Sequence, residues 1–580
     1  MDTRSEFNEA NKKETKKSLF DPSEIKGISL KSAKTFFSGK IARAFRSVSK
    51  FFSFTSSRVY GLAFLSFGIL TLFLHLGEYY FMDDPQVEVS SLVIGAVFTL
   101  VSLLFLPSDK PICSAIQSVR LFDFIVYDFF SINRVQQRGE KSKTNSAEGI
   151  LFGFLLALFG FFFPTEYAVL LILGLVFVII SMVSPEFPYI LSLLLFPYLP
   201  LLPYSSYILV IFVAGALVSF ARKVFVGKRV YNFEIYDFLF LFLILSVFVT
   251  GVILGGEAST ENSILTIVFL IGYFPASNMA INRRLFDCVA GAISASSIPV
   301  GIYAAVQYIV SLASGSAVKS KAFFDTPEIF AAYLSAVAIF SLYLARKRTR
   351  RVKKAYYYSV FALSFIALLT TELFIVLITI ILAVVSLSII RSKKVPIFLL
   401  ILVEALPVLL FLLNDSADAF VSDIFSLSLA DRKSVAAGAF SFFLDNPILG
   451  MGVENPFSAL DFSSNLYLAI VCRFGVLALI VFLLLIVLRA CHFGLFRKYF
   501  SDSTVNFYAE ISILASVCML LIGSLSDVFA DIRMIYFFTA VFSVGSSALR
   551  ISKKEKEEMR LYYSDLGNSD LAEIDISIKK

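Results

Sequence analysis

Charged side chains that interrupt long apolar runs are the first candidates for chemistry in this sequence. Arg473 lies within the apolar run 469–475. Because an ionisable group is costly inside a membrane-spanning segment, it marks a functional site by default. The alternative is that Arg473 forms a structural pair with an acid from a neighbouring helix. The position is about two helical turns below the expected outer membrane surface.

A second cation, Arg432, lies near the start of residues 426–445, a stretch that predicts an amphipathic helix ended by Asn446-Pro447. An arginine there can hold a phosphate or pyrophosphate in two-point contact, and a helix N-terminus also favours anions. Alternatively, Arg432 and Lys433 meet anionic headgroups or Asp431.

Two acids lie at the same predicted membrane surface, and one further polar residue lies within a predicted span. Glu372 occupies the very short turn between two predicted spans, and Asp527 lies near Arg533 in the last hairpin. Acids at the ends of spans are also common as solvated groups. Gln307 is the one larger polar side chain in a span, 286–312, that is rich in small residues. Close helix packing and the lining of a cavity are both open for that span.

The composition determines which class of molecule must position these residues. The 580 residues are 58% hydrophobic and 16% charged, with a mean hydropathy of +0.81. A soluble globular chain carries about 25% charged residues, so a soluble protein is excluded. Only two histidines are present, His75 and His492, which excludes catalysis that needs two or three of them. The five cysteines have no C-x-x-C spacing, so we expect neither a disulfide framework nor a metal site.

The apolar runs predict an all-α polytopic integral membrane protein with about 14–16 transmembrane helices, since one span needs about 20 residues. With the N-terminus inside, the predicted cytoplasmic loops carry 25 Lys and Arg and the external loops 5. This bias predicts that both termini are cytoplasmic, and it explains the net charge of +7 without nucleic-acid binding. The predicted spans are 60–81, 90–107, 149–164, 167–184, 187–203, 205–221, 236–254, 262–280, 286–312, 328–345, 355–371, 373–391, 395–414, 466–489, 509–526 and 532–550.

Five segments follow from this topology. Residues 1–58 form a basic amphipathic arm that we expect on the anionic inner leaflet, with a partly disordered tail as the alternative. An extra transmembrane hairpin (59–108) and a cytoplasmic loop (109–148) precede the main transmembrane domain, 149–550. A polar cytoplasmic tail, 551–580, ends the chain. The one long external loop, 415–465, is expected to be ordered, and long loops in compact proteins are often functional.

Several motifs, in this order, resemble the O-antigen ligase and polysaccharide polymerase superfamily. Residues 445–453, Asp-Asn-Pro-Ile-Leu-Gly-Met-Gly-Val, follow Asp431-Arg432 and precede Ser464-Asn-Leu-Tyr-Leu468 and Phe474-Gly475. Upstream, residues 301–307 and 323–333 are similar to the family's G-[IL]-Y-x-x-x-Q and [FT]-x-N-P-N-x-x-A-x-Y stretches. The resemblance covers about 149–550.

The resemblance implies a GT-C-type glycosyltransferase on the outer face of the bacterial cytoplasmic membrane. Its donor would be a polyprenyl-pyrophosphate-linked glycan and its acceptor a glycan, lipid or protein, with no cofactor. Arg432 would hold the pyrophosphate and stabilise its developing charge, and Asp527 would orient or balance a basic partner. Arg473 stands where the family usually has Glu, and Leu373 where it has Arg, so Arg473 is expected to supply the missing cation if the two helices adjoin.

The family's His-Asn pair is Ser464-Asn465 in this chain. With no external histidine, the base that activates the acceptor hydroxyl is expected to be a carboxylate, Glu372, Glu454 or Asp461. The alternative is a non-catalytic family member that acts as a scaffold in envelope assembly or transports a lipid-linked glycan.

Overall fold

The structure of the protein is a computed structural model. The structure describes residues 47, 51–81, 89–130, 132, 145–202, 204–225, 229, 231–254, 257–279, 283–315, 319–347, 350–371, 444, 447–450, 452, 465–496, 503–524 and 526–565. The described residues form helices, short connections and one isolated β-bridge, Ser56 to Pro111. The basic arm is described only at Ser47 and from residue 51 on, so its amphipathic helix lies largely outside the described residues.

The apolar runs fold as helices because a chain in lipid must satisfy its backbone hydrogen bonds internally. Within the described residues, ten helices are long and apolar enough to cross a membrane, and four shorter apolar helices accompany them. These elements coincide with the fourteen predicted spans outside 372–443, which confirms an all-α polytopic membrane protein. The predicted spans 373–391 and 395–414, and most of the loop 415–465, lie outside the described residues.

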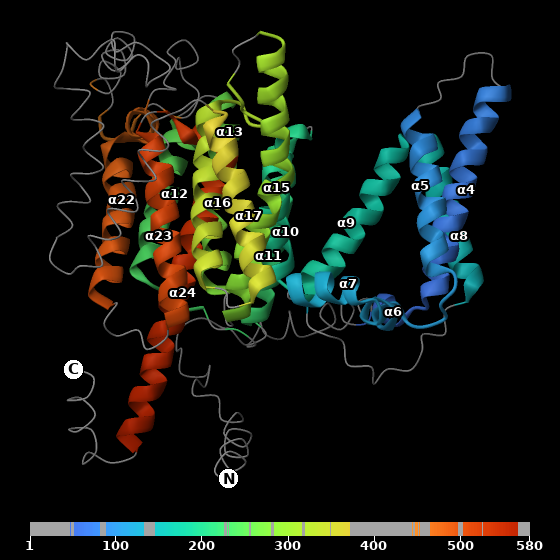
Figure 1. The fold of residues 1–580 in the computed structure, drawn as a ribbon, viewed down its shortest axis with the longest axis horizontal. Helices are drawn as coiled ribbons and strands as arrows, with labels where there is room; N and C mark the ends of the chain where they lie inside the picture. The colour runs from blue at the N-terminus through green and yellow to red at the C-terminus, as the bar shows by residue number, and fades with distance from the viewer. Residues whose placement is uncertain are drawn as a thin grey trace.

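Three helices form a separate N-terminal unit: α4 (Ser57–Phe81), α5 (Val89–Phe105) and α8 (Ser146–Phe162). Figure 1 shows them side by side, apart from the larger helical bundle. They pack through glycines. A Cβ on Gly153 of α8 would lie 2.0 Å from Ser66 Oγ, and one on Gly68 would lie 2.4 Å from Thr99 Oγ1. Helix α8, which begins the predicted main domain, therefore packs against the extra hairpin.

Short helices and one long helix join this unit to the rest. The predicted loop 109–148 contains α6 (Ile112–Ser118), α7 (Arg120–Asp123) and the π-helix η2 (Phe124–Phe129). These elements run along one end of the molecule, and α9 (Thr165–Val183) rises between the unit and the bundle (Figure 1). Helix α9 contacts α5 and α8 on one side and α10 and α11 on the other.

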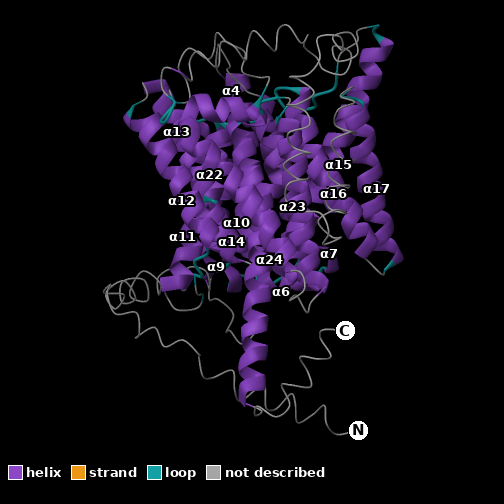
Figure 2. Ribbon diagram, turned by 90° about the vertical axis from the view of Figure 1, so that its left-hand side faces the viewer, coloured by secondary structure: helices purple, strands orange, loops and turns teal. Residues whose placement is uncertain are grey.

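The remaining helices form the main bundle, whose axes run in broadly one direction (Figure 2). Helix α24 continues past one end of the bundle to Asp565, into the predicted polar tail. The bundle elements are α10 (Glu186–Leu195), η3 (Phe196–Leu201), α11 (Ser205–Phe225), α12 (Ile235–Val247), η4 (Phe248–Ile253), α13 (Glu257–Ile271), α14 (Tyr273–Met279), α15 (Arg283–Ala313), α16 (Pro327–Lys347), α17 (Arg351–Leu369), α22 (Leu466–Phe496), α23 (Ser503–Gly523), η8 (Val528–Ala530) and α24 (Ile532–Asp565).

The small residues of α15 serve helix packing. Ser296 Oγ lies 2.7 Å from the Tyr333 hydroxyl, and Ser294 Oγ lies 3.3 Å from Ser341 Oγ, both on the neighbouring α16. A Cβ on Gly301 would lie 3.0 Å from Leu363 of α17. Of the two interpretations of this span, these contacts favour packing.

The two ends of the main bundle differ in the polar groups they bury. At the end from which α24 protrudes, Arg550 forms two contacts with Asp237, of 2.9 and 2.8 Å, and donates to Ser277 Oγ. The other end carries the described residues of the connection between α23 and α24, 524 and 526–531, and we call it the Asp527 end. The described candidate residues lie there.

Candidate functional site

Asn465 fixes the start of α22 at the Asp527 end. Its Oδ1 accepts hydrogen bonds from the backbone N–H groups of Tyr467 and Leu468, at 2.8 and 3.2 Å, and so caps the helix. Its Nδ2 donates to the backbone carbonyl of Ser524, 3.0 Å away. One side chain therefore joins the beginning of α22 to the end of α23.

Helix α22 is broken at Gly475, whose φ of 81° and ψ of 172° are not helical. This conformation is essentially restricted to glycine. The break leaves the Arg473 carbonyl and the Val476 N–H without partners inside the helix. Residues of the 445–453 motif form hydrogen bonds with both of them. Gly452 N–H donates to the Arg473 carbonyl at 2.9 Å, and Val476 N–H donates to the Pro447 carbonyl at 3.0 Å.

The contact between the motif and the break is close on both sides. A Cβ on Gly475 would lie 2.0 Å from the Ile448 carbonyl oxygen, and one on Gly450 would lie 2.6 Å from the Gly475 nitrogen. Two segments that resemble the family, residues 447–450 with Gly452 and residues Phe474-Gly475, are thus held together by direct backbone contact, although their positions in the sequence give no sign of it.

Arg473 forms an ion pair with Asp527, with Arg473 Nη1 2.7 Å from Asp527 Oδ2. The Asp527 side chain is 1% exposed and the Arg473 side chain 19% exposed. Burial raises the pKa of Asp527, and the neighbouring Arg473 charge opposes that rise. Asp527, expected to balance a basic partner, is therefore paired with Arg473.

A second arginine at this end, Arg533, has a hydrogen-bond partner for each of its guanidinium nitrogens. Arg533 contacts Asp531 through Nε and Nη2, at 2.7 and 2.8 Å, and its Nη1 donates to Ser205 Oγ. Asp325 lies 3.5 Å from Arg533 Nη2. This cluster joins α24 to α11 and to the start of α16. Because these contacts hold three helices together, its role is structural.

Gln307 holds a turn at the same end of the bundle. Its Oε1 accepts hydrogen bonds from Ser320 Oγ and from the Ala322 backbone N–H, both at 3.1 Å. Ser320 N–H in turn donates to the carbonyl of Thr370, at the end of α17. Gln307 thus supports the part of the chain that precedes residue 372.

The structure brings four of the nine predicted site residues to one end of the bundle: Gln307, Asn465, Arg473 and Asp527. The other five lie outside the described residues: Glu372, Arg432, Glu454, Asp461 and Ser464. Their described chain neighbours include Thr371 and Asn465, which both belong to the Asp527 end. Whether Arg473 lies near Glu372 or Arg432 stays a prediction.

Neither histidine belongs to this site. His75 Nε2 lies 3.2 Å from Thr165 Oγ1 in the contact between α4 and α9, and His492 Nδ1 lies 2.6 Å from the Tyr236 hydroxyl in the main bundle. Within the described residues, no group of three or more His, Cys, Asp and Glu side chains could hold a metal ion.

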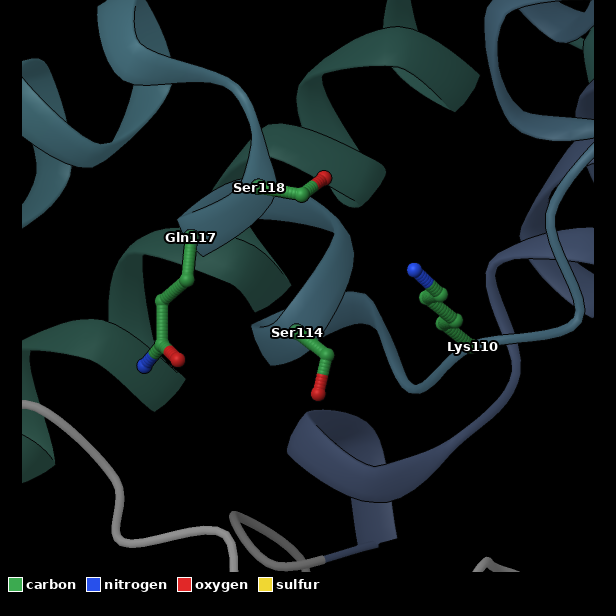
Figure 3. Close-up of a pocket in the computed structure, with 4 residues that line it drawn as sticks. All are labelled: Lys110, Ser114, Gln117 and Ser118. Carbon is green, nitrogen blue, oxygen red and sulfur yellow. The ribbon is translucent and has the colours of Figure 1, made fainter.

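A surface hollow of about 540 Å³ is lined by Lys110, Ser114, Gln117 and Ser118 (Figure 3). It lies around α6, at the end of the molecule from which α24 protrudes (Figure 1). It is therefore separate from the Arg473 and Asp527 pair.

The amino-acid sequence indicated some parts of this site and not others. A cation in an apolar run identified Arg473, but the sequence named no partner for it. The close contact of Gly450 with Gly475 had only the family motifs as a signal.

Comparison of the chain with protein-family models and with curated protein sequences gives no match.

Proposed function

We propose that this protein is a glycan polymerase or ligase that transfers a polyprenyl-pyrophosphate-linked oligosaccharide at the Asp527 end. In this proposal the Asp527 end faces outward from the bacterial cytoplasmic membrane and both termini are cytoplasmic. The observation that carries the proposal is the contact of Pro447 and Gly452 with the break in α22, directly beside the Arg473 and Asp527 pair. Motifs that the family resemblance predicts to act together are adjacent in space.

The chemistry of the Arg473 and Asp527 pair suits a glycan donor that carries an anionic pyrophosphate. A guanidinium has five N–H donors, and the contact with Asp527 is through Nη1, so Arg473 retains donors for a pyrophosphate oxygen. Asp527 balances the Arg473 charge when no substrate is bound. In the proposal Arg432 joins Arg473 on the pyrophosphate and stabilises the leaving group. Glu372, Glu454 or Asp461 takes the proton of the acceptor hydroxyl.

Complementation of a deletion strain tests this function. Glu372→Gln and Arg432→Ala should each abolish glycan extension while the protein remains in the membrane at wild-type amounts. Lys433→Ala, which removes the neighbouring cation, is the matched control and should retain extension. Wild-type extension in both Glu372→Gln and Arg432→Ala would exclude this mechanism.

A second candidate function, a scaffold or a transporter of the lipid-linked glycan, is favoured by one observation. Arg473 is paired with a buried carboxylate from a neighbouring segment, which is the arrangement expected of a structural arginine. This candidate predicts binding of a polyprenyl-phosphate lipid without turnover and tolerance of both substitutions.

The lipid-linked intermediate that accumulates in the deletion strain separates the possible activities. Accumulated single repeat units indicate a polymerase, and long undelivered chains indicate a ligase. Unchanged chain length with glycan retained on the cytoplasmic side indicates the transporter.

A further inference from the structure

The hollow of about 540 Å³ around α6, which we call the α6 hollow, is lined by polar side chains. Ser114, Gln117 and Ser118 occupy positions i, i+3 and i+4 of this helix, so they share one face. Lys110 extends toward the helix from the connection that precedes it (Figure 3). The volume is within the range of about 300–1,000 Å³ that is common for small-molecule pockets. The proposed glycan transfer uses none of these residues.

Backbone hydrogen bonds place the α6 hollow at the level where the first span begins. The Ile112 N–H donates to the Thr55 carbonyl at 3.0 Å, and the Ser57 N–H donates to the Lys110 carbonyl at 2.9 Å. Ser57 is the first residue of α4, which is long and apolar enough to cross a membrane. The lining residues therefore lie close to the plane of the lipid headgroups, at the end of the molecule from which α24 protrudes.

The charge of Lys110 is not compensated within the part of the chain that the structure describes. Its side chain is exposed, and no described carboxylate lies within ion-pair distance of it. The acid adjacent in sequence, Asp109, lies 3.6 Å from Arg58 instead. Ser118 Oγ donates to the Ala115 carbonyl, so it remains an acceptor for a ligand hydroxyl. An uncompensated ammonium beside hydroxyl groups suits a phosphate ester.

The helices that follow α6 carry exposed apolar side chains at the same end of the molecule. Leu121 and Phe122 of α7 and Phe124 of η2 are exposed. Arg120 adds a second exposed cation. Cations beside exposed apolar side chains are typical of segments that lie in the interface of a membrane. Such a segment holds the α6 hollow at the depth of the lipid phosphates.

We propose that the α6 hollow binds the phosphate headgroup of an anionic phospholipid. Lys110 pairs with the phosphate, and the hydroxyls of Ser114 and Ser118 form hydrogen bonds with the headgroup. An anionic lipid is favoured over a zwitterionic one, because the cation of a zwitterionic headgroup competes with Lys110 for the phosphate. An anionic membrane surface also attracts lysine and arginine. The site lies apart from the Asp527 end and does not depend on the proposed glycan transfer.

Amide hydrogen exchange of residues 112–118, in the full-length protein reconstituted into nanodiscs, tests the proposal. Exchange should be several-fold slower in discs that contain phosphatidylglycerol than in discs of phosphatidylcholine alone. In Lys110→Ala, the fraction of phosphatidylglycerol that gives half of this slowing should rise about fivefold, the contribution of one cation at an anionic membrane surface. Lys110→Arg should respond as the wild type does. Lys353→Ala, which removes an exposed lysine from α17, is the matched control and should also respond as the wild type.

Two results would overturn the proposal. One is equal exchange of residues 112–118 in the two kinds of disc. The other is an undiminished response in Lys110→Ala, which would assign the effect to other cations. Because Lys110 is exposed, Lys110→Ala should keep the fold, and unchanged protection of the Val476 amide checks this.

Inorganic phosphate added to phosphatidylcholine discs distinguishes a lipid headgroup from a free ion. It should leave the exchange of residues 112–118 unchanged, because the free ion lacks the acyl chains that hold a lipid at the membrane surface. Slowing as large as that caused by phosphatidylglycerol would show that the α6 hollow takes free phosphate, and would exclude the lipid.

Discussion

Individual charged residues in this protein are stabilised by partners that lie far away in the sequence. Asp527 is almost wholly buried, and it tolerates burial because Arg473 lies 2.7 Å away. Arg533 and Arg550 are similarly held by carboxylates. Removing one member of a buried pair leaves the other charge without compensation, which costs more than removing both.

We therefore expect Asp527→Asn to lower the free energy of unfolding by about 3 kcal/mol, the lower end of the range for buried pairs because Arg473 is partly exposed. The double variant Arg473→Met with Asp527→Leu should recover most of this loss. Unfolding in mixed detergent micelles measures both. If the single and double variants were equally unstable, the ion pair with Arg473 would not be the reason why Asp527 contributes to the free energy of unfolding.

The break in α22 is the element that organises the candidate site. A straight helix through residue 475 would leave no free backbone groups for residues 447–452 to bind. Gly475 supplies a backbone conformation that other residues rarely adopt, and its lack of a side chain admits the Ile448 carbonyl. The two hydrogen bonds at the break then hold the motif beside Arg473.

Gly475→Ala should lower the free energy of unfolding by about 2 kcal/mol or more, because the backbone strain alone is of order 1–3 kcal/mol. It should also displace residues 447–452. The measurement is amide hydrogen exchange at Gly452 and Val476, the two donors at the break, which should become faster. Gly174→Ala in α9, where no atom lies within 4 Å of the added Cβ, is the control and should leave both amides protected.

At the scale of the whole molecule, the N-terminal unit and the main bundle have separate cores. Phe67, Leu156, Ala157 and Ala168 form the small core of the unit and its contact with α9. The larger core belongs to the main bundle and contains the described candidate site. The two parts are joined through α6, α7, η2 and α9, so damage to one core should leave the other intact.

Gly153→Val should separate α8 from α4, because even a Cβ at this position would overlap Ser66 and Ala63. Disulfide cross-linking between cysteines introduced on α4 and α8 should become slower, while the protection of Gly452 and Val476 amides should not change. Gly77→Val, which faces open space, should leave cross-linking unaffected. Loss of protection at Val476 in Gly153→Val would show that the two cores are coupled.

The sequence by itself determined the class of fold and the fourteen apolar segments that the structure describes as helices. It could do so because the preference of a helix for lipid depends on about 20 consecutive residues. It also singled out Arg473, since a charge in an apolar run is a local anomaly. Only the tertiary structure decided that Arg473 pairs with Asp527, that Pro447 and Gly452 bind at the break beside Gly475, and that α8 packs with the hairpin. Each of these depends on contacts between distant segments, and hydropathy and charge counts carry no information about which helices become neighbours.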